Sequence, residues 1–125
     1  MKNVKMGVRI LLGLGMVFFG LTKFIPEMMP AMEMTPEMGS WMGALMATGF
    51  VMKLVAVIEI ATGVMFLINK YVPLSLVVLL PVMVIAFLSH LILDPAGVPG
   101  SAVFLILIIL MMVWNKASYK DVLKA

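Results

Sequence analysis

Four long apolar runs follow one another along the chain, and the second and third connections between them, residues 69–72 and 94–98, are short. The runs cover residues 6–25, 41–68, 73–93 and 99–114. A helix needs about 20 residues to cross the hydrocarbon of a bilayer, and short connections make consecutive helices antiparallel neighbours. The pattern therefore predicts an all-α integral membrane protein, in which residues 1–125 form one transmembrane domain built as an antiparallel four-helix bundle. The second run is long enough to tilt, or to begin as a turn at the membrane interface.

The composition supports this fold class and excludes several others. Hydrophobic residues make up 64% of the 125 residues and charged residues only 12%, whereas a soluble domain has about 45–50% and about 25%. The chain has no cysteine, which excludes disulfide exchange, thiolate metal sites and cysteine-ligated iron–sulfur clusters. No polar face interleaves aromatic and basic residues, so nucleic acid is not an expected partner.

Basic residues gather at the chain ends and in one connection, and this distribution predicts the orientation. Segments next to membrane helices that carry an excess of Lys and Arg stay in the cytoplasm. Both termini and the connection at residues 69–72 are therefore predicted to be cytoplasmic, and the other two connections to lie outside. The residues that carry this prediction are Lys2, Lys5, Arg9, Lys70, Lys116, Lys120 and Lys124.

Glu59 lies in the middle of the second apolar run, where hydrocarbon cannot solvate a carboxylate. Placing an ionisable group at a bilayer centre costs roughly 3 kcal/mol, so such residues usually face a protein interior or a wet cavity. Ala56 and Gly63 lie on nearly the same helix face and favour close packing. Lys53 is six residues earlier, about 120° away around the helix, so the two side chains do not pair. The partner of Glu59 must come from another helix.

The first run also has a helix face of small and basic residues, which could pack against the face that carries Glu59. The residues of this face are spaced by four, three, four and three. Small residues on this face would let a neighbouring helix approach closely. Comparison of depths along two antiparallel helices predicts an interaction between Arg9 and Glu59. This interaction would be either a structural ion pair or a ligand and proton site, and snorkelling of the cations to opposite membrane surfaces stays an alternative. The face consists of Arg9, Gly13, Met16, Gly20 and Lys23.

A second group of polar residues is predicted near the outer surface. His90 and Asp94 are one helical turn apart at the end of the third run. With Lys23 and Lys53 at a similar depth, they would build a polar pocket that opens outward. The alternative is an interfacial His90, with Asp94 capping the turn before Pro95. One histidine and one carboxylate are too few ligands to indicate a metal site.

The connection after the first run is rich in methionine, of which the whole chain has 15. Clustered thioethers suit Cu(I), and Met29, Met32 and Met34 have usable spacings. The alternative is a flexible apolar surface that adapts to lipid or to a partner. We favour this alternative because methionines are scattered through the predicted helices as well.

A small-residue face also opens the second run. Gly39, Gly43 and Ala47 repeat at every fourth residue, which is typical of helix contacts in which two backbones approach closely. This face is predicted either to pack within the bundle or to contact a second copy of the chain, so a homo-oligomer is one candidate assembly.

Four segments form an ordered set of motifs over nearly the whole chain. In the first, Arg9 opens an apolar helix that closes with Gly20-Leu-Thr-Lys23-Phe24; in the second, Glu59 is followed by Gly63. The third is His90-Leu-Ile-Leu-Asp94-Pro95, and the fourth is the tail from Trp114 to Tyr119. In this order the segments resemble the DoxX family of small membrane proteins, the last two its short subgroup.

The resemblance implies a four-helix protein of the cell inner (cytoplasmic) membrane that is linked to redox complexes such as thiosulfate:quinone or terminal oxidase systems. The leading hypothesis is an accessory or quinone-proximal subunit without an intrinsic cofactor. Glu59 and His90 would then exchange protons with a quinone or hydrogen-bond its carbonyl, and Lys53 would stabilise negative charge. Catalysis by this chain alone is not expected, because no haem, flavin or metal motif is visible.

Two alternatives come from other functional classes. The chain could bind or carry a small anion or a lipid, with its cations as ligands, or it could be a purely structural membrane subunit. The expected partners are the lipid bilayer and the subunits of a redox complex. The candidate residues for ligand binding or proton exchange are Glu59, Arg9, Lys53, His90, Lys23 and Asp94.

Overall fold

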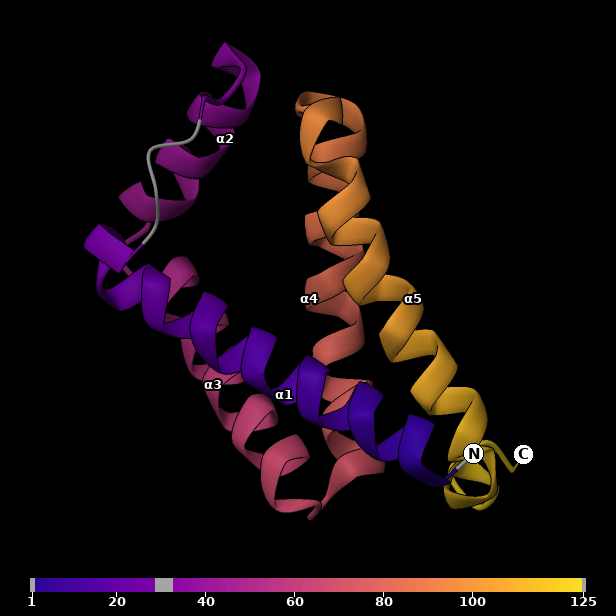
Figure 1. Ribbon diagram of the computed structural model, residues 1–125. Helices are drawn as coiled ribbons and strands as arrows, with labels where there is room; N and C mark the ends of the chain where they lie inside the picture. The colour runs from indigo at the N-terminus through magenta and orange to yellow at the C-terminus, as the bar shows by residue number, and fades with distance from the viewer. Residues whose placement is uncertain (1, 29–32, 125) are drawn as a thin grey trace.

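The computed structural model describes residues 2–28 and 33–124, and within them it contains helices and no strand (Figure 1). This confirms the predicted all-α fold class. The α-helices are α1 (Lys2–Phe24), α2 (Pro36–Ala47), α3 (Val51–Ile68), α4 (Val72–Leu93) and α5 (Val98–Trp114). Short 3₁₀ turns are η1 (Pro26–Met28), η2 (Pro95–Gly97) and η3 (Lys116–Tyr119).

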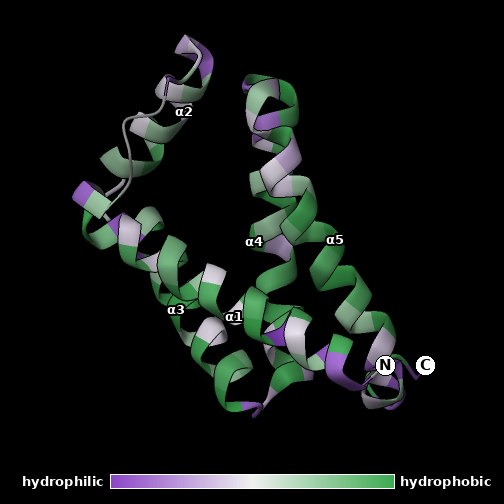
Figure 2. Cartoon of the chain, viewed as in Figure 1, coloured by the Kyte–Doolittle hydropathy of each residue, from purple (hydrophilic) through white to green (hydrophobic). Residues whose placement is uncertain are grey.

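Four helical stretches are long and apolar enough to cross a membrane: α1, α3, α4 and the stretch Pro95–Trp114, which joins η2 to α5. Each carries large apolar side chains on its outer surface, among them Leu14, Leu54, Ile85 and Ile106, and hydrophobic residues dominate all four (Figure 2). Water would not solvate so much contiguous apolar surface. The hydrocarbon of a bilayer does accommodate such a surface, so the chain is a multi-pass integral membrane protein.

Of the two alternatives for residues 41–68, one long tilted helix is wrong, because the structure divides this run between α2 and α3. Gly49 has φ +80°, a left-handed conformation that glycine adopts at little cost. The Thr48 hydroxyl donates to the Leu45 carbonyl at 2.7 Å and accepts from the Val51 amide at 3.1 Å. These bonds satisfy backbone groups on both sides of the break. Hydropathy stays high through these residues, so the apolar pattern does not reveal the break.

Helix α2 is too short to span a bilayer, and side-chain hydrogen bonds attach it to α4. The Thr35 hydroxyl caps α2 by accepting from the Met38 amide at 3.2 Å, and it donates to the carbonyl of Leu93 at the end of α4. The Trp41 indole Nε1 donates to the Ser89 hydroxyl at 3.1 Å. Two separate bonds therefore hold α2 beside the last turns of α4.

The small-residue face of α2 does not pack within the bundle. Among the described residues, a Cβ atom placed on Gly39 or Gly43 would meet nothing within 4 Å, and both glycines are exposed. Ala47 is exposed as well. The prediction of internal packing is therefore wrong for this face, and contact with a second copy of the chain stays a prediction.

Helices α1 and α3 pack backbone against backbone through their glycines. A Cβ atom on Gly63 would lie 2.8 Å from the Gly13 carbonyl oxygen and 2.9 Å from the Val17 nitrogen. A Cβ atom on Gly20 would lie 2.9 Å from the Ala56 carbonyl oxygen. Such close approach is the usual role of small residues between membrane helices. The prediction that the glycine face of the first helix points inward is confirmed, since Gly13 and Gly20 are buried.

Helices α4 and α5 form the second pair, and aromatic rings join it to α1. The Phe19 and Phe104 rings meet edge to face with centroids 5.4 Å apart, a favourable arrangement of two aromatic quadrupoles. Gly15 lies against the Phe104 ring, which a Cβ atom would meet at 2.6 Å. The apolar core between the two pairs includes Leu12, Met16, Phe66, Leu76, Leu79 and Ile108.

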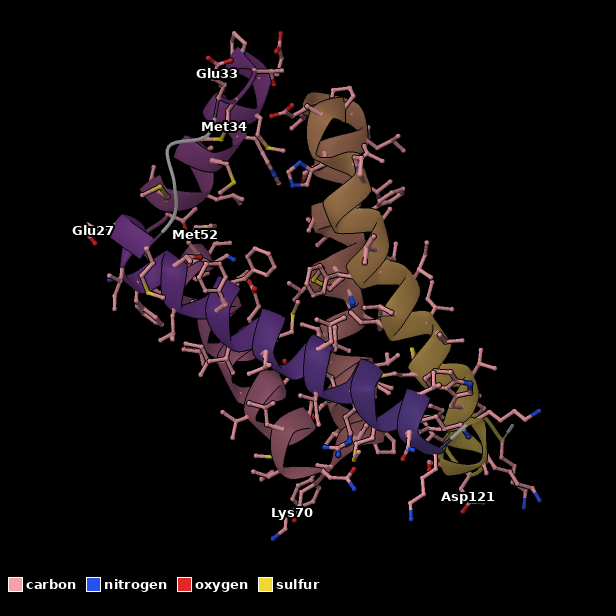
Figure 3. All side chains as sticks on the ribbon, viewed as in Figure 1. Glu27, Glu33, Met34, Met52, Lys70 and Asp121 are labelled. Carbon is pink, nitrogen blue, oxygen red and sulfur yellow. The ribbon has the colours of Figure 1, made fainter. Side chains whose placement is uncertain are left out.

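The two helix pairs meet at one end of the molecule and diverge toward the other, where α2 lies (Figure 1). Both termini and the connection from α3 to α4 are at the end where the pairs meet (Figure 1). Lys70 and Asp121 also lie there, whereas Glu27 and Glu33 lie at the α2 end (Figure 3). The basic termini and the basic connection therefore share one membrane face.

The C-terminal turn is fastened to the start of α4 by Tyr119. Its hydroxyl donates to the Pro73 carbonyl at 2.8 Å, and the residue is buried. Burial raises the pKa of the Tyr119 phenol above its ordinary value of about 10, so the hydroxyl stays protonated and able to donate at neutral pH. This bond holds the terminal residues close to the connection between α3 and α4.

Candidate functional site

Glu59 forms an ion pair with Lys23, with 2.6 Å between the Lys23 Nζ and the Glu59 Oε1 atoms. Glu59 comes from the middle of α3 and Lys23 from the last turn of α1. The Glu59 side chain is 5% exposed and the Lys23 side chain 22%. It is the one ion pair within the described parts of the chain. The predicted interaction between Arg9 and Glu59 is therefore wrong, although the partner does come from the predicted face of the first helix.

The contacts between α1 and α3 explain why Lys23 is the partner. Gly20 packs against Ala56 and Ile60, so Lys23 lies slightly beyond the level of Glu59 along the bundle. Side chains of an α-helix lean toward its N-terminus. Because the helices are antiparallel, the Lys23 and Glu59 side chains lean toward each other, and their ends meet.

Arg9 lies at the other end of the same helix pair, against the C-terminus of α3. Its Nη1 donates to the Phe66 carbonyl and, at 3.4 Å, to the Leu67 carbonyl. The last carbonyls of a helix have no partner within it and carry the negative end of the helix dipole. Arg9 therefore caps α3 and is too far along the seam to reach Glu59.

The groups around the ion pair are hydrogen-bonded within their own helices. The Thr62 hydroxyl donates to the Ile58 carbonyl at 2.7 Å, and the Thr22 hydroxyl donates to the Phe19 carbonyl at 2.6 Å. Lys23 Nζ also donates to the Phe19 carbonyl, at 3.4 Å. An ammonium has three donors, so Lys23 keeps one donor beyond these two contacts. The arrangement can hold or release a proton and can donate a hydrogen bond from its partly exposed ammonium.

The four residues of the predicted outer pocket are not joined by any ion pair or hydrogen bond within residues 2–28 and 33–124. Lys23 pairs with Glu59, and Lys53 is exposed. Asp94 is buried, but its side chain caps no turn; its backbone carbonyl accepts from the Gly97 amide at 3.1 Å instead. The polar pocket stays a prediction, and the proposed capping by the Asp94 side chain is wrong.

His90 packs against the 3₁₀ turn η2. Its Nδ1 atom is buried and has no hydrogen-bond partner in the part of the chain that the structure describes, and a Cβ atom on Gly97 would overlap the imidazole ring. Glycine at this position therefore makes room for the ring. Within the described residues, no group of three or more His, Asp and Glu side chains could hold a metal ion.

The structure describes only Met34 of the three methionines in the predicted copper site. Met29 and Met32 lie outside the described residues. Met34 is exposed at the α2 end of the molecule, and its side chain is drawn in Figure 3. The copper hypothesis and its alternative, a flexible apolar surface, therefore both stay predictions.

Sequence reasoning missed a cavity of about 420 Å³ at the end that carries both termini. Lys2 and Lys5 line it, although in the sequence they served only to predict orientation. Arg9 and Trp114 also line it, and Lys5 Nζ lies 5.7 Å from the centroid of the Trp114 ring. The signal in the sequence was a basic first turn together with a tryptophan at the end of the last span.

A smaller cavity of about 350 Å³ lies between α3 and α4 and has an almost entirely apolar lining, which includes Met65, Leu74 and Val78. Neither cavity is lined by Lys23 or Glu59.

Comparison with known proteins adds no assignment: no protein-family model, no curated protein and no solved structure matches the chain. The chain is thus identified as a multi-pass integral membrane protein by its own helices, with a buried ion pair between α1 and α3.

Proposed function

We propose that the chain is a DoxX-like accessory subunit of a membrane redox complex, in which the pair of Lys23 and Glu59 is the quinone-proximal site. The observation that carries the proposal is the 2.6 Å ion pair between α1 and α3, in which the Glu59 side chain is only 5% exposed. Ionisable residues within membrane spans are costly and commonly mark proton or substrate pathways. A buried ion pair usually adds little net stability to a fold, since apolar residues of similar volume often stabilise the protein equally well.

The chemistry assigned to this chain is limited to protons and hydrogen bonds. A quinone takes up two electrons and two protons to become a quinol. In this role the electrons would come from a partner subunit of the complex; the lack of cysteine excludes a cysteine-ligated iron–sulfur cluster in this chain. The remaining donor of Lys23 can hydrogen-bond a quinone carbonyl. The Glu59 carboxylate can accept a proton from its surroundings and, once protonated, pass it to a reduced quinone oxygen. Access is through the exposed part of Lys23, which a quinone dissolved in the bilayer would approach from the lipid side.

A matched double variant tests this role. Lys23→Met with Glu59→Leu removes both charges and keeps side chains of similar length, so it should fold. We expect a short-chain quinone to raise the melting temperature of the purified wild type but not that of the double variant. Lys23→Arg, which keeps the pair but changes the donor geometry, should show a reduced shift. The same shift in all three proteins, or stabilisation by inorganic anions and not by quinones, would refute the proposal.

The alternatives have less support at this site. A carrier of small anions would use the cations of the chain as ligands, but at this site Glu59 neutralises the charge of Lys23. A purely structural subunit needs no particular chemistry at Glu59, so Glu59→Gln would leave its bound partners unchanged. Co-purification of wild type and Glu59→Gln from native membranes separates this alternative from the redox role, in which the partners include electron-transfer subunits.

We infer that both termini face the cytoplasm and that the membrane is the inner one. The basic termini and Lys70 lie at the same end of the molecule (Figures 1 and 3), which supports this orientation. Because the chain has no cysteine, single substitutions are clean probes. Ser118→Cys, in the exposed C-terminal turn, should resist an impermeant thiol reagent in intact cells, and Ser40→Cys, in exposed α2, should react. The reverse labelling pattern would overturn the orientation.

A further inference from the structure

The cavity at the end with both termini is walled by three separate parts of the chain. The first turns of α1 form one wall, the connection from α3 to α4 forms the second, and the end of α5 forms the third. Its polar character comes from the cations of Lys2, Lys5 and Arg9 and from the carboxamides of Asn3, Asn69 and Asn115. These segments come together only in the folded chain, so the cavity is a product of the tertiary structure.

The cavity has a strong excess of positive charge. Among residues 2–28 and 33–124, three cations line it and no Asp or Glu side chain does. Arg9 is directed to the carbonyls at the end of α3, which leaves the two lysines of α1 as its free charges. Asp121 lies at the same end of the molecule (Figure 3) but does not line the cavity. A negatively charged ligand would therefore balance the charge of the lining.

The rest of the lining is apolar, apart from the amphipathic Trp114. This favours an anion that also has an apolar part. Met6, Val72 and Met111 line the cavity beside the cations. Trp114 ends the last span and stacks under the Lys5 ammonium, and tryptophan is typical of the level of lipid headgroups. A ligand with a phosphate group and a hydrocarbon tail matches both parts of the lining.

We propose that this cavity binds the headgroup of an anionic phospholipid from the leaflet at the end with both termini. Lys2 and Lys5 contact the phosphate, carboxamides such as that of Asn69 offer further hydrogen bonds, and the first acyl carbons lie on the apolar wall. Basic pockets between membrane helices are known to hold such headgroups. The site is separate from Lys23 and Glu59, so it does not depend on the proposed redox role.

Two double variants with equal loss of charge test the site. Lys2→Gln with Lys5→Gln removes the two free cations of the cavity. Lys116→Gln with Lys120→Gln removes two exposed lysines from the C-terminal segment that do not line it. Each protein is reconstituted with phosphatidylglycerol or with phosphatidylcholine of the same acyl chains, and retained lipid is measured by native mass spectrometry. We expect phosphatidylglycerol to be retained by the wild type, and about 30-fold more weakly by the first double variant.

The second double variant should retain phosphatidylglycerol as the wild type does. An equal loss in both variants would mean diffuse attraction to the membrane surface and would overturn the site. Equal retention of phosphatidylcholine and phosphatidylglycerol by the wild type would overturn the role of the cations. A separate arm adds inorganic phosphate to the lipid-bound protein in detergent. Displacement of the lipid at equal concentration would assign the cavity to a free anion instead.

Discussion

Replacing Lys23 by methionine should lower the free energy of unfolding by about 3 kcal/mol. The variant leaves the Glu59 carboxylate without its partner in a position where the side chain is only 5% exposed. An uncompensated buried charge is much more costly than the same pair left intact. The change can be measured as denaturant-induced unfolding in detergent micelles, followed by the fluorescence of Trp41 and Trp114.

A double-mutant cycle isolates the interaction itself. Glu59→Leu alone should cost less than Lys23→Met alone, because the more exposed Lys23 can extend its ammonium toward water. The double variant should regain most of the stability, which gives a large coupling energy. Arg9→Met serves as the control, because its effect should simply add to that of Glu59→Leu. Additive effects of Lys23→Met and Glu59→Leu, or coupling between Arg9 and Glu59, would contradict the ion pair in the structure.

Replacing Gly63 by alanine should destabilise the protein by about 1–3 kcal/mol, the usual cost of overfilling a close-packed contact. The new Cβ atom would lie 2.8 Å from the Gly13 carbonyl oxygen and 2.9 Å from the Val17 nitrogen. Both are backbone atoms of α1, so no side-chain rotation can relieve the contact. The two helices must move apart, which also weakens the contacts around Gly20.

Gly7→Ala is the matched control within α1. A Cβ atom at Gly7 would meet nothing within 4 Å, and alanine is the better helix former by about 1 kcal/mol. We expect this variant to be as stable as the wild type or more stable. Thermal unfolding of both variants in the same detergent compares them directly. Equal effects of the two substitutions would show that helix propensity, and not the contact between α1 and α3, governs stability here.

Several features of the fold follow from local sequence. The lengths of the apolar runs predict the four spans, because about 20 residues must cover the hydrocarbon whatever the neighbours are. The spacing of Gly13, Met16 and Gly20 predicts the inward face of α1, because the helical period is fixed. The break at Gly49 was missed, since its cause is one left-handed residue and one capping hydroxyl. Neither changes the hydropathy of the run.

Like the fold, the candidate site could be predicted only in part from the sequence. The cost of a charge in hydrocarbon marks Glu59, and the helical period excludes Lys53 as its partner. Helical periodicity tells which side a residue faces, but it does not tell how far one helix slides along another. That height is decided by the close backbone contacts of Gly13 with Gly63 and of Gly20 with Ala56, and the partners in each contact are distant in the chain.

The sequence by itself determined that this protein is made of apolar helices in a membrane, with a carboxylate that needs a partner. Only the tertiary structure decided that the partner is Lys23, that Arg9 caps α3, and that Lys2 and Lys5 line a cavity. The physical reason is that solvation acts on each segment separately. Pairing and cavities depend on the relative heights of helices, which the packing of backbones sets.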